Sequence, residues 1–128
     1  MLAVDASVAV EACFGRFDLG RLAELVAPPL LWSECRSAIH EAGWRGDVTR
    51  GEADAAHAQL AGLPISCRDH PDLGADAWRI AGQLGWARTY DAEYVALALL
   101  LGCRLLTTDG RLRRSADRLG FVVGPLEL

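Results

Sequence analysis

Short apolar runs alternate with longer stretches of helical spacing along this chain, and that alternation restricts the fold more than any other feature. Helices placed between strands are the connections that parallel strands require. The sequence therefore predicts an α/β sandwich with a mainly parallel sheet. The runs that predict strands are residues 2–4, 63–67, 104–107 and 121–123, and those that predict helices are residues 6–14, 19–26, 30–44, 49–63, 72–84, 91–102 and 110–119.

Length and composition predict one folded domain, residues 1–128, rather than a disordered or membrane-spanning chain. The 128 residues are 52% hydrophobic, which is enough for a single core. The longest apolar run, Val95–Leu101, is too short to cross a bilayer. The N-terminus lacks the basic region of a signal peptide. We therefore expect a cytoplasmic protein without a membrane partner.

The ionisable and sulfur-containing residues exclude several chemistries. Arginine holds all 13 of the Lys or Arg positions, so a Walker A motif and a Schiff-base lysine are both excluded. The net charge is −4, so any contact with nucleic acid needs a local basic patch. The cysteines lack the close pairs of a zinc site and are expected to be reduced, packed thiols. They are Cys13, Cys35, Cys67 and Cys103.

Four acidic residues stand at positions from which their carboxylates can converge. Asp5 follows the first apolar run and Asp109 follows the run at 104–107, and ligands of parallel sheets bind beyond such strand ends. Asp91 begins a helix that is apolar almost all round, and Glu34 lies beside the apolar stripe of its helix. Taken singly, each aspartate could instead be a helix N-cap, and Glu34 a half-exposed charge.

Convergence of these four carboxylates would require a cation. Their mutual repulsion would force some of them to bind protons, and the chain has no lysine to neutralise them. A hard divalent cation with oxygen ligands, Mg²⁺ or Mn²⁺, suits such a set. We therefore expect Asp5, Glu34, Asp91 and Asp109 to be catalytic metal ligands at a site that acts on a phosphodiester.

Four segments together resemble the motifs of PIN-domain ribonucleases, and most of all the VapC toxins of bacterial toxin–antitoxin pairs. They are VDASV, SECRSAI, TYDAEYVALA and LLTTDGRL, in the family's order and across essentially the whole chain. The resemblance implies a three-layer α/β/α sandwich with a five-stranded, mainly parallel sheet. It also implies an endoribonuclease that uses Mg²⁺ or Mn²⁺, acts as a homodimer and is silenced by a VapB-like antitoxin.

The resemblance also assigns roles to single residues. The four acids named above match the family's acidic positions. Ser7 matches a hydroxyl position just after the first acid, and Thr107 matches the threonine of the T-x-D motif. Ser37 stands where the family often has asparagine, a difference that bears on the fine geometry of the site. Asp117 is a further acid, two helical turns past Asp109.

A basic strip that begins directly after Asp109 is the predicted RNA-binding surface. Arg111, Arg114 and Arg118 share one helical face, and Arg36 lies close to Glu34 in sequence. The alternative is a solvated helix face without a ligand. Tryptophans could stack on bases, but their helical contexts favour core or dimer packing, and the histidines are expected at the surface or in loops. These residues are Trp32, Trp44, Trp78, Trp86, His40, His57 and His70.

Two other functions are weighed against a nuclease. A phosphatase with a nucleophilic aspartate needs the second aspartate of a DxD pattern, which VDASV lacks. A catalytically weak PIN-like scaffold would bind RNA or a partner without cutting RNA. Cleavage by the purified protein in manganese, compared with Asp5→Ala and Asp91→Ala, distinguishes the scaffold from the enzyme.

Overall fold

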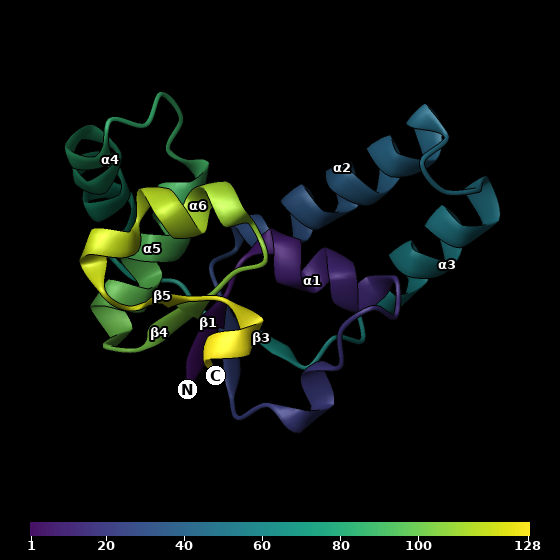
Figure 1. The fold of residues 1–128 in the computed structure, drawn as a ribbon, viewed down its shortest axis with the longest axis horizontal. Coiled ribbons are helices and arrows are strands. Elements are labelled where there is room, and N and C mark those ends of the chain that lie inside the picture. Colours follow the sequence, from purple (N-terminus) through teal and green to yellow (C-terminus); the bar gives the residue numbers. More distant parts are fainter.

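The computed structural model describes residues 1–128 and contains one five-stranded sheet in the order β3-β2-β1-β4-β5, parallel at every pairing (Figure 1). The predicted α/β fold with a parallel sheet is therefore confirmed. The strands are β1 (Leu2–Val4), β2 (Leu25–Ala27), β3 (Ile65–Cys67), β4 (Arg104–Leu106) and β5 (Val122–Val123). The helices are α1 (Ala6–Cys13), α2 (Leu30–Arg45), α3 (Arg50–Leu60), α4 (Leu73–Leu84), α5 (Tyr90–Leu101) and α6 (Gly110–Ser115), with 3₁₀ turns η1 (Leu19–Arg21), η2 (Asp117–Leu119) and η3 (Pro125–Glu127).

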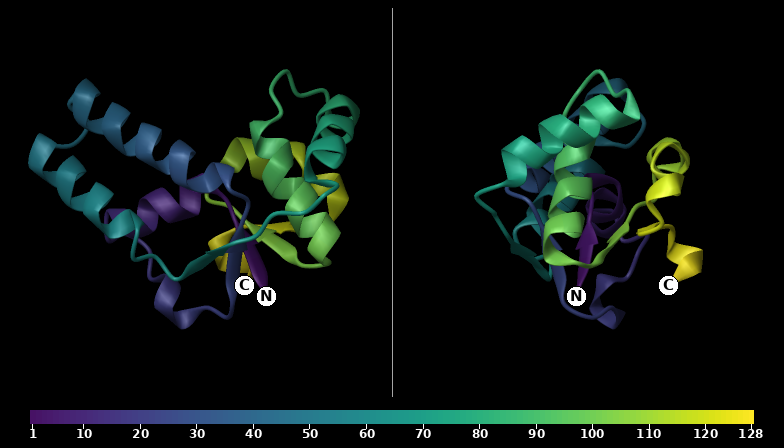
Figure 2. Two further views of the ribbon diagram at one scale, coloured as in Figure 1. Left: turned by 180° about the vertical axis from the view of Figure 1, so that it is seen from behind. Right: turned by 90° about the vertical axis from the view of Figure 1, so that its left-hand side faces the viewer.

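The helices lie on both sides of the sheet. In the edge-on view of Figure 2, α4 and α5 lie on one side and α1 lies on the other. Helix α5 packs directly on β1 and β4, and residues 94–98 in its middle are all buried. The α2–α3 pair projects from the end of the molecule that lies opposite α4 (Figure 1). None of these helices has both the length and the apolar character needed to cross a bilayer.

The central strands β1 and β4 bring distant parts of the chain to one edge of the sheet. Their register pairs Val4 with Leu106, so the next residues, Asp5 and Thr107, emerge side by side. The amide of Asp5 also donates a hydrogen bond of 3.3 Å to the Leu106 carbonyl. Among polar and charged residues, only Asp5 (4% exposed) and Thr107 (1%) are buried. This strand edge is therefore the one place where the core contains polar side chains.

Two of the predicted helices differ from those observed. The helix predicted at 19–26 is wrong, because the chain forms only the turn η1 and then strand β2, which lies between β1 and β3. All three β2 residues are buried, and a run this short has no periodicity that separates strand from helix. The helix predicted at 110–119 is interrupted at Ala116, so that α6 is followed by η2.

Helices α2 and α3 approach each other closely at one glycine. A Cβ added to Gly43 would lie 2.9 Å from the Cβ of Ala53, closer than two methyl groups can pack. Helix α3 begins with the capping box that Thr49 and Glu52 predict, since both reciprocal hydrogen bonds are present. The projecting pair is thus held by a tight crossing and a well-formed helix start.

Candidate metal and active site

Asp5 is a buried carboxylate held by hydroxyl and amide donors. It is the N-cap of α1, and its Oδ1 accepts hydrogen bonds from Ser7 Oγ (2.6 Å) and the Val8 amide (3.2 Å). Its Oδ2 accepts a hydrogen bond of 2.5 Å from Thr107 Oγ1. Asp5 is therefore an N-cap, as the sequence allows, and the hydroxyls of Ser7 and Thr107 orient its carboxylate.

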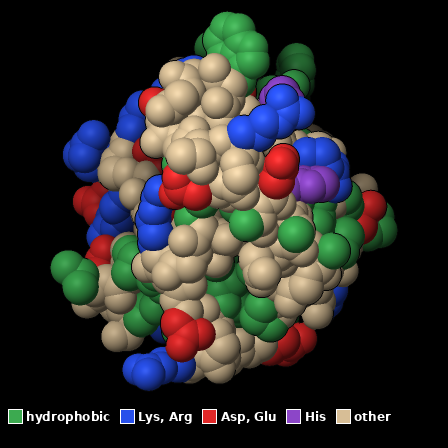
Figure 3. All heavy atoms as spheres, turned by 90° about the vertical axis from the view of Figure 1, so that its right-hand side faces the viewer, with side chains coloured by type: hydrophobic (Ala, Val, Ile, Leu, Met, Phe, Trp, Pro, Cys, Tyr) green, Lys and Arg blue, Asp and Glu red, His purple; other side chains and the backbone are tan.

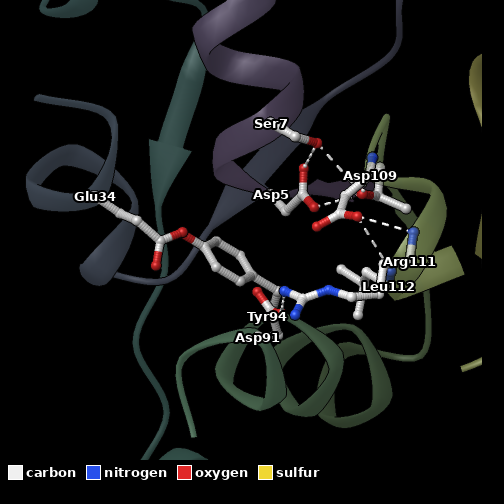
Figure 4. A network of polar contacts seen from close by, with 9 residues as sticks. Asp5, Ser7, Glu34, Asp91, Tyr94, Asp109, Arg111 and Leu112 are labelled. Carbon is white, nitrogen blue, oxygen red and sulfur yellow. Dashed lines mark hydrogen bonds and ion pairs between the residues drawn. The ribbon is translucent and has the colours of Figure 1, made fainter. Parts of the chain in front are cut away.

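Thr107 connects Asp5 to Asp109. While its hydroxyl donates to Asp5, the same oxygen accepts a hydrogen bond of 3.0 Å from the Asp109 amide. Asp109 is the N-cap of α6, accepting from the amides of Arg111 (2.9 Å) and Leu112 (3.3 Å). In Figure 4 the Asp5 and Asp109 side chains lie next to each other. The two strand-end acids are thus brought together, as the sequence predicts.

Asp91 lies across from this pair, in the first turn of α5. A terminal nitrogen of Arg111 lies 3.9 Å from Asp91 Oδ2, and Figure 4 shows the guanidinium reaching across the site to that carboxylate. Arg111 therefore supplies the positive charge nearest to Asp91 in this structure. The pair is exposed, so its contribution to stability is small.

Glu34 faces a different partner from the other three acids. Its Oε1 accepts a hydrogen bond of 3.0 Å from the hydroxyl of Tyr94, a fully buried residue of α5. Figure 4 shows the Glu34 carboxylate beyond the tyrosine ring, away from Asp5 and Asp109. Ser37 lies one turn further along α2, exposed and without a side-chain hydrogen bond. Helix α2 therefore places Glu34 at the rim of the site and not at its centre.

The acids perturb one another's protonation. Burial raises the pKa of Asp5 to about 6 despite its three hydrogen bonds, and repulsion from Asp91 adds to the rise. Burial and then repulsion from Asp109 raise the pKa of Asp91. Burial also raises the pKa of Glu34, where Tyr94 opposes the rise and Asp91 and Asp5 add to it. Burial, and to a smaller extent repulsion between acids, therefore disfavours the ionised forms of all three carboxyls.

These carboxylates would be stabilised by a divalent cation, although their side chains are not arranged as a complete coordination site. No group of three His, Cys, Asp or Glu side chains is placed to hold a metal ion. The full convergence expected from the sequence is thus not seen, because Glu34 faces Tyr94 and Arg111 lies beside Asp91. The donor chemistry nevertheless fits Mg²⁺ or Mn²⁺, since every donor is a carboxylate oxygen and magnesium usually keeps several waters.

An open cleft of about 650 Å³ lies beside Asp91 and Glu34. One wall is the segment at 85–90, the loop after α4 together with the first residue of α5, which contributes Trp86, Arg88 and Tyr90. The other wall includes Arg111 and Ser115 at α6. Arg111 joins the cleft to the acids, because its amide binds Asp109 and its guanidinium faces Asp91. Arg88 and Tyr90 were not singled out from the sequence, since Arg88 lies in a loop without periodicity and Tyr90 is only the first residue of α5, before Asp91.

The other predicted RNA-binding arginines lie outside this cleft. Arg114 is exposed on α6, with its guanidinium near Gly110, and Arg118 donates a 2.8 Å hydrogen bond to the Gln83 carbonyl. Arg36 donates to His57 (3.3 Å) in a second hollow of about 340 Å³, between α2 and α3. Figure 3, which faces the α2–α3 end, shows histidine and arginine side chains close together there.

Asp117 belongs to a separate ion pair. Arg113 Nη1 donates to Asp117 (2.6 Å), while its other nitrogens donate to the two carboxylate oxygens of Glu127 (2.8 and 2.7 Å). These contacts fasten η3 to α6 rather than adding an acid to the cleft. Elsewhere the four cysteines are free, and Cys13 and Cys35 are packed in the core as predicted, but that prediction is wrong for Cys67, which is exposed. Trp44 and Trp78 are also exposed.

Comparison with known proteins matches residues 2–118 to the PIN domain family. The chain is 33% identical to VapC ribonuclease Mb0985 of Mycobacterium bovis over 120 residues, covering 88% of each chain. It is 35% identical to Ribonuclease VapC3 of Mycobacterium tuberculosis over 119 residues, covering 88% of this chain and 85% of that one. The crystal structure of PAE2754 from Pyrobaculum aerophilum shares the fold, with a TM-score of 0.75, 23% identity and coverage of 98% of this chain and 90% of that one. This chain therefore belongs to the PIN domain family, among the relatives of the VapC ribonucleases.

Proposed function

We propose that this chain is a metal-dependent endoribonuclease, the toxin of a type II toxin–antitoxin pair, which hydrolyses RNA phosphodiester bonds with water. The observation that carries the proposal is the buried carboxylate of Asp5, held by Thr107 and Ser7 next to Asp109 and opposite Asp91. A buried carboxylate among like charges is unfavourable unless a cation neutralises it. Similarity to two VapC ribonucleases supports RNA as the substrate.

Asp5, Asp91 and Asp109 would hold the cation, with Glu34 reaching it from the rim. A bound Mg²⁺ or Mn²⁺ would supply positive charge for the phosphate and lower the pKa of a bound water. The chain's own hydroxyls keep Asp5 fixed, and Arg111 is placed to bind a phosphate oxygen. Attack by water with departure of the 3′ oxygen gives 5′-phosphate and 3′-hydroxyl ends.

Two partners belong to the same proposal. A VapB-like antitoxin would silence the enzyme, since the relatives are VapC proteins. A homodimer would cover apolar side chains that this chain leaves exposed, such as Trp78 (77% exposed) on α4 and Leu99 on α5. Sedimentation of Trp78→Gln beside the unchanged protein tests whether Trp78 lies in a dimer contact.

Cleavage of RNA by the purified protein in Mn²⁺ tests the proposed activity. We expect cleavage by the unchanged protein, loss with Asp5→Ala or Asp91→Ala, and no loss with Asp47→Asn, an exposed acid beyond the end of α2. Products with cyclic phosphate ends would contradict hydrolysis by water. RNA binding without any cleavage would instead identify a scaffold.

A further inference from the structure

The loop after α4 and the first residue of α5 carry an arginine without an ion-pair partner and an exposed aromatic ring directly beside the acids. Arg88 is exposed and makes no hydrogen bond or ion pair within the chain, in contrast to Arg36, Arg113 and Arg118. Tyr90 is 51% exposed, although it immediately precedes Asp91. Both residues line the cleft. An arginine and a tyrosine ring that are exposed on the wall of this cleft are therefore available to bind a ligand.

The opposite wall carries a second cation. Arg111 faces this loop across the cleft, so positive charge lies on both sides of a site whose centre is acidic. A nucleic-acid strand has the complementary arrangement, because phosphates flank the scissile bond and bases project to the side. The volume of about 650 Å³ is that of a pocket for a drug-sized ligand, so it suits a short stretch of one strand rather than a double helix.

We propose that Arg88 and Tyr90 bind the nucleotide next to the scissile phosphate, with Arg88 on a neighbouring phosphate and the Tyr90 ring stacked on its base. Trp86, which is half-buried, packs against the core and so anchors the same segment to the rest of the protein. Stacking on Tyr90 requires a base whose face is free, so these two residues select unpaired nucleotides at the cleavage position. The inference rests on the proposed function, because it takes RNA as the substrate.

Binding of a fluorescent RNA oligonucleotide in EDTA tests the inference without cleavage. Replacing Tyr90 by leucine should weaken binding at least about fivefold, while Tyr90→Phe retains it, since ring stacking contributes about 1–3 kcal/mol per base. Replacing Arg88 by glutamine should lower the slope of log affinity against log salt by about 0.7, the value for one phosphate contact on a single strand. Annealing a complementary strand should remove the effect of Tyr90→Leu.

Matched variants come from the hollow between α2 and α3, where Arg50 and Trp44 are also exposed. Arg50→Gln and Trp44→Leu should leave both affinity and salt slope unchanged. The inference fails if these variants weaken binding as much as the loop variants do, if Tyr90→Phe behaves like Tyr90→Leu, or if no binding is detected. Melting temperatures of the variants within a degree or two of the unchanged protein exclude loss of folding.

Cleavage in Mn²⁺ separates this inference from the proposed function. If the unchanged protein cuts RNA, Arg88→Gln and Tyr90→Leu should raise KM far more than they lower kcat. A fall in kcat alone would show that neither residue binds the substrate. If the unchanged protein binds RNA through this loop but never cuts it, the proposed activity fails while the assigned contacts remain.

Discussion

At the scale of single residues, the ionised carboxylate of Asp5 destabilises the folded chain. The folded chain raises the pKa of this carboxyl from 3.8 to about 6, chiefly by burial. The folded state therefore binds a proton more tightly than the unfolded state, and the stability that this proton confers is lost as pH rises from about 4 to about 6. Above the pKa of the folded state, ionised Asp5 lowers the free energy of unfolding by its full amount, on the order of 3 kcal/mol.

Replacing Asp5 by asparagine should remove most of this penalty. In EDTA at pH 7 we expect Asp5→Asn to unfold at higher urea than the unchanged chain, and the difference should vanish below about pH 4. Asp91 and Glu34, whose pKa values are raised in the same direction, leave a smaller slope in the variant. Urea titrations from pH 3 to 8 measure the effect, and equal pH slopes would contradict it.

Thr107 gives a second prediction at this scale, because its hydroxyl serves two acids at once. Thr107→Val keeps the shape but leaves Asp5 Oδ2 and the Asp109 amide without this partner. We expect a loss of about 1–3 kcal/mol in unfolding free energy and a large fall in RNA cleavage. Thr107→Ser keeps the hydroxyl and should restore most of the cleavage. Equal activities of the two variants would show that the hydroxyl does not orient the site.

At the scale of elements, the α2–α3 crossing depends on the absence of a side chain at Gly43. Gly43→Ala adds a methyl group that meets Ala53, whereas Gly82→Ala, in α4, meets nothing within 4 Å. Both changes favour helix by about 1 kcal/mol, but overpacking opposes only the first, by about 1–3 kcal/mol. We therefore expect Gly82→Ala to be the more stable variant in urea. The reverse order would show that α2 and α3 can separate freely.

At the scale of the whole molecule, a bound metal should stabilise the fold. The carboxylates come from separate segments, so a cation that binds them binds only the folded chain. Excess Mn²⁺ should raise the melting temperature, by the equivalent of about 2.7 kcal/mol at one hundred times Kd. The same addition should leave Asp5→Ala unchanged. An unchanged melting temperature for the original protein would contradict a metal site among these acids.

The sequence predicts the centre of the site better than its rim. Asp5 and Asp109 follow apolar runs, and parallel pairing of β1 and β4 must bring such positions together. Glu34 could not be placed in the same way, because its partner Tyr94 reads as one more apolar position of a buried helix. Strand β2 was missed for a related reason, since a run of three buried residues is too short for its spacing to distinguish a strand from a helix.

The partnership between Asp5 and Thr107 spans 102 residues, and this separation has a consequence for synthesis of the protein. A nascent chain on the ribosome can form α1 and α2 early, but β1 has no β4 to pair with until residue 106 has emerged. Until then Asp5 lacks its hydroxyl donor from Thr107 and its neighbour Asp109. A nuclease built this way cannot cut the message being translated until residues 104–109 have left the exit tunnel.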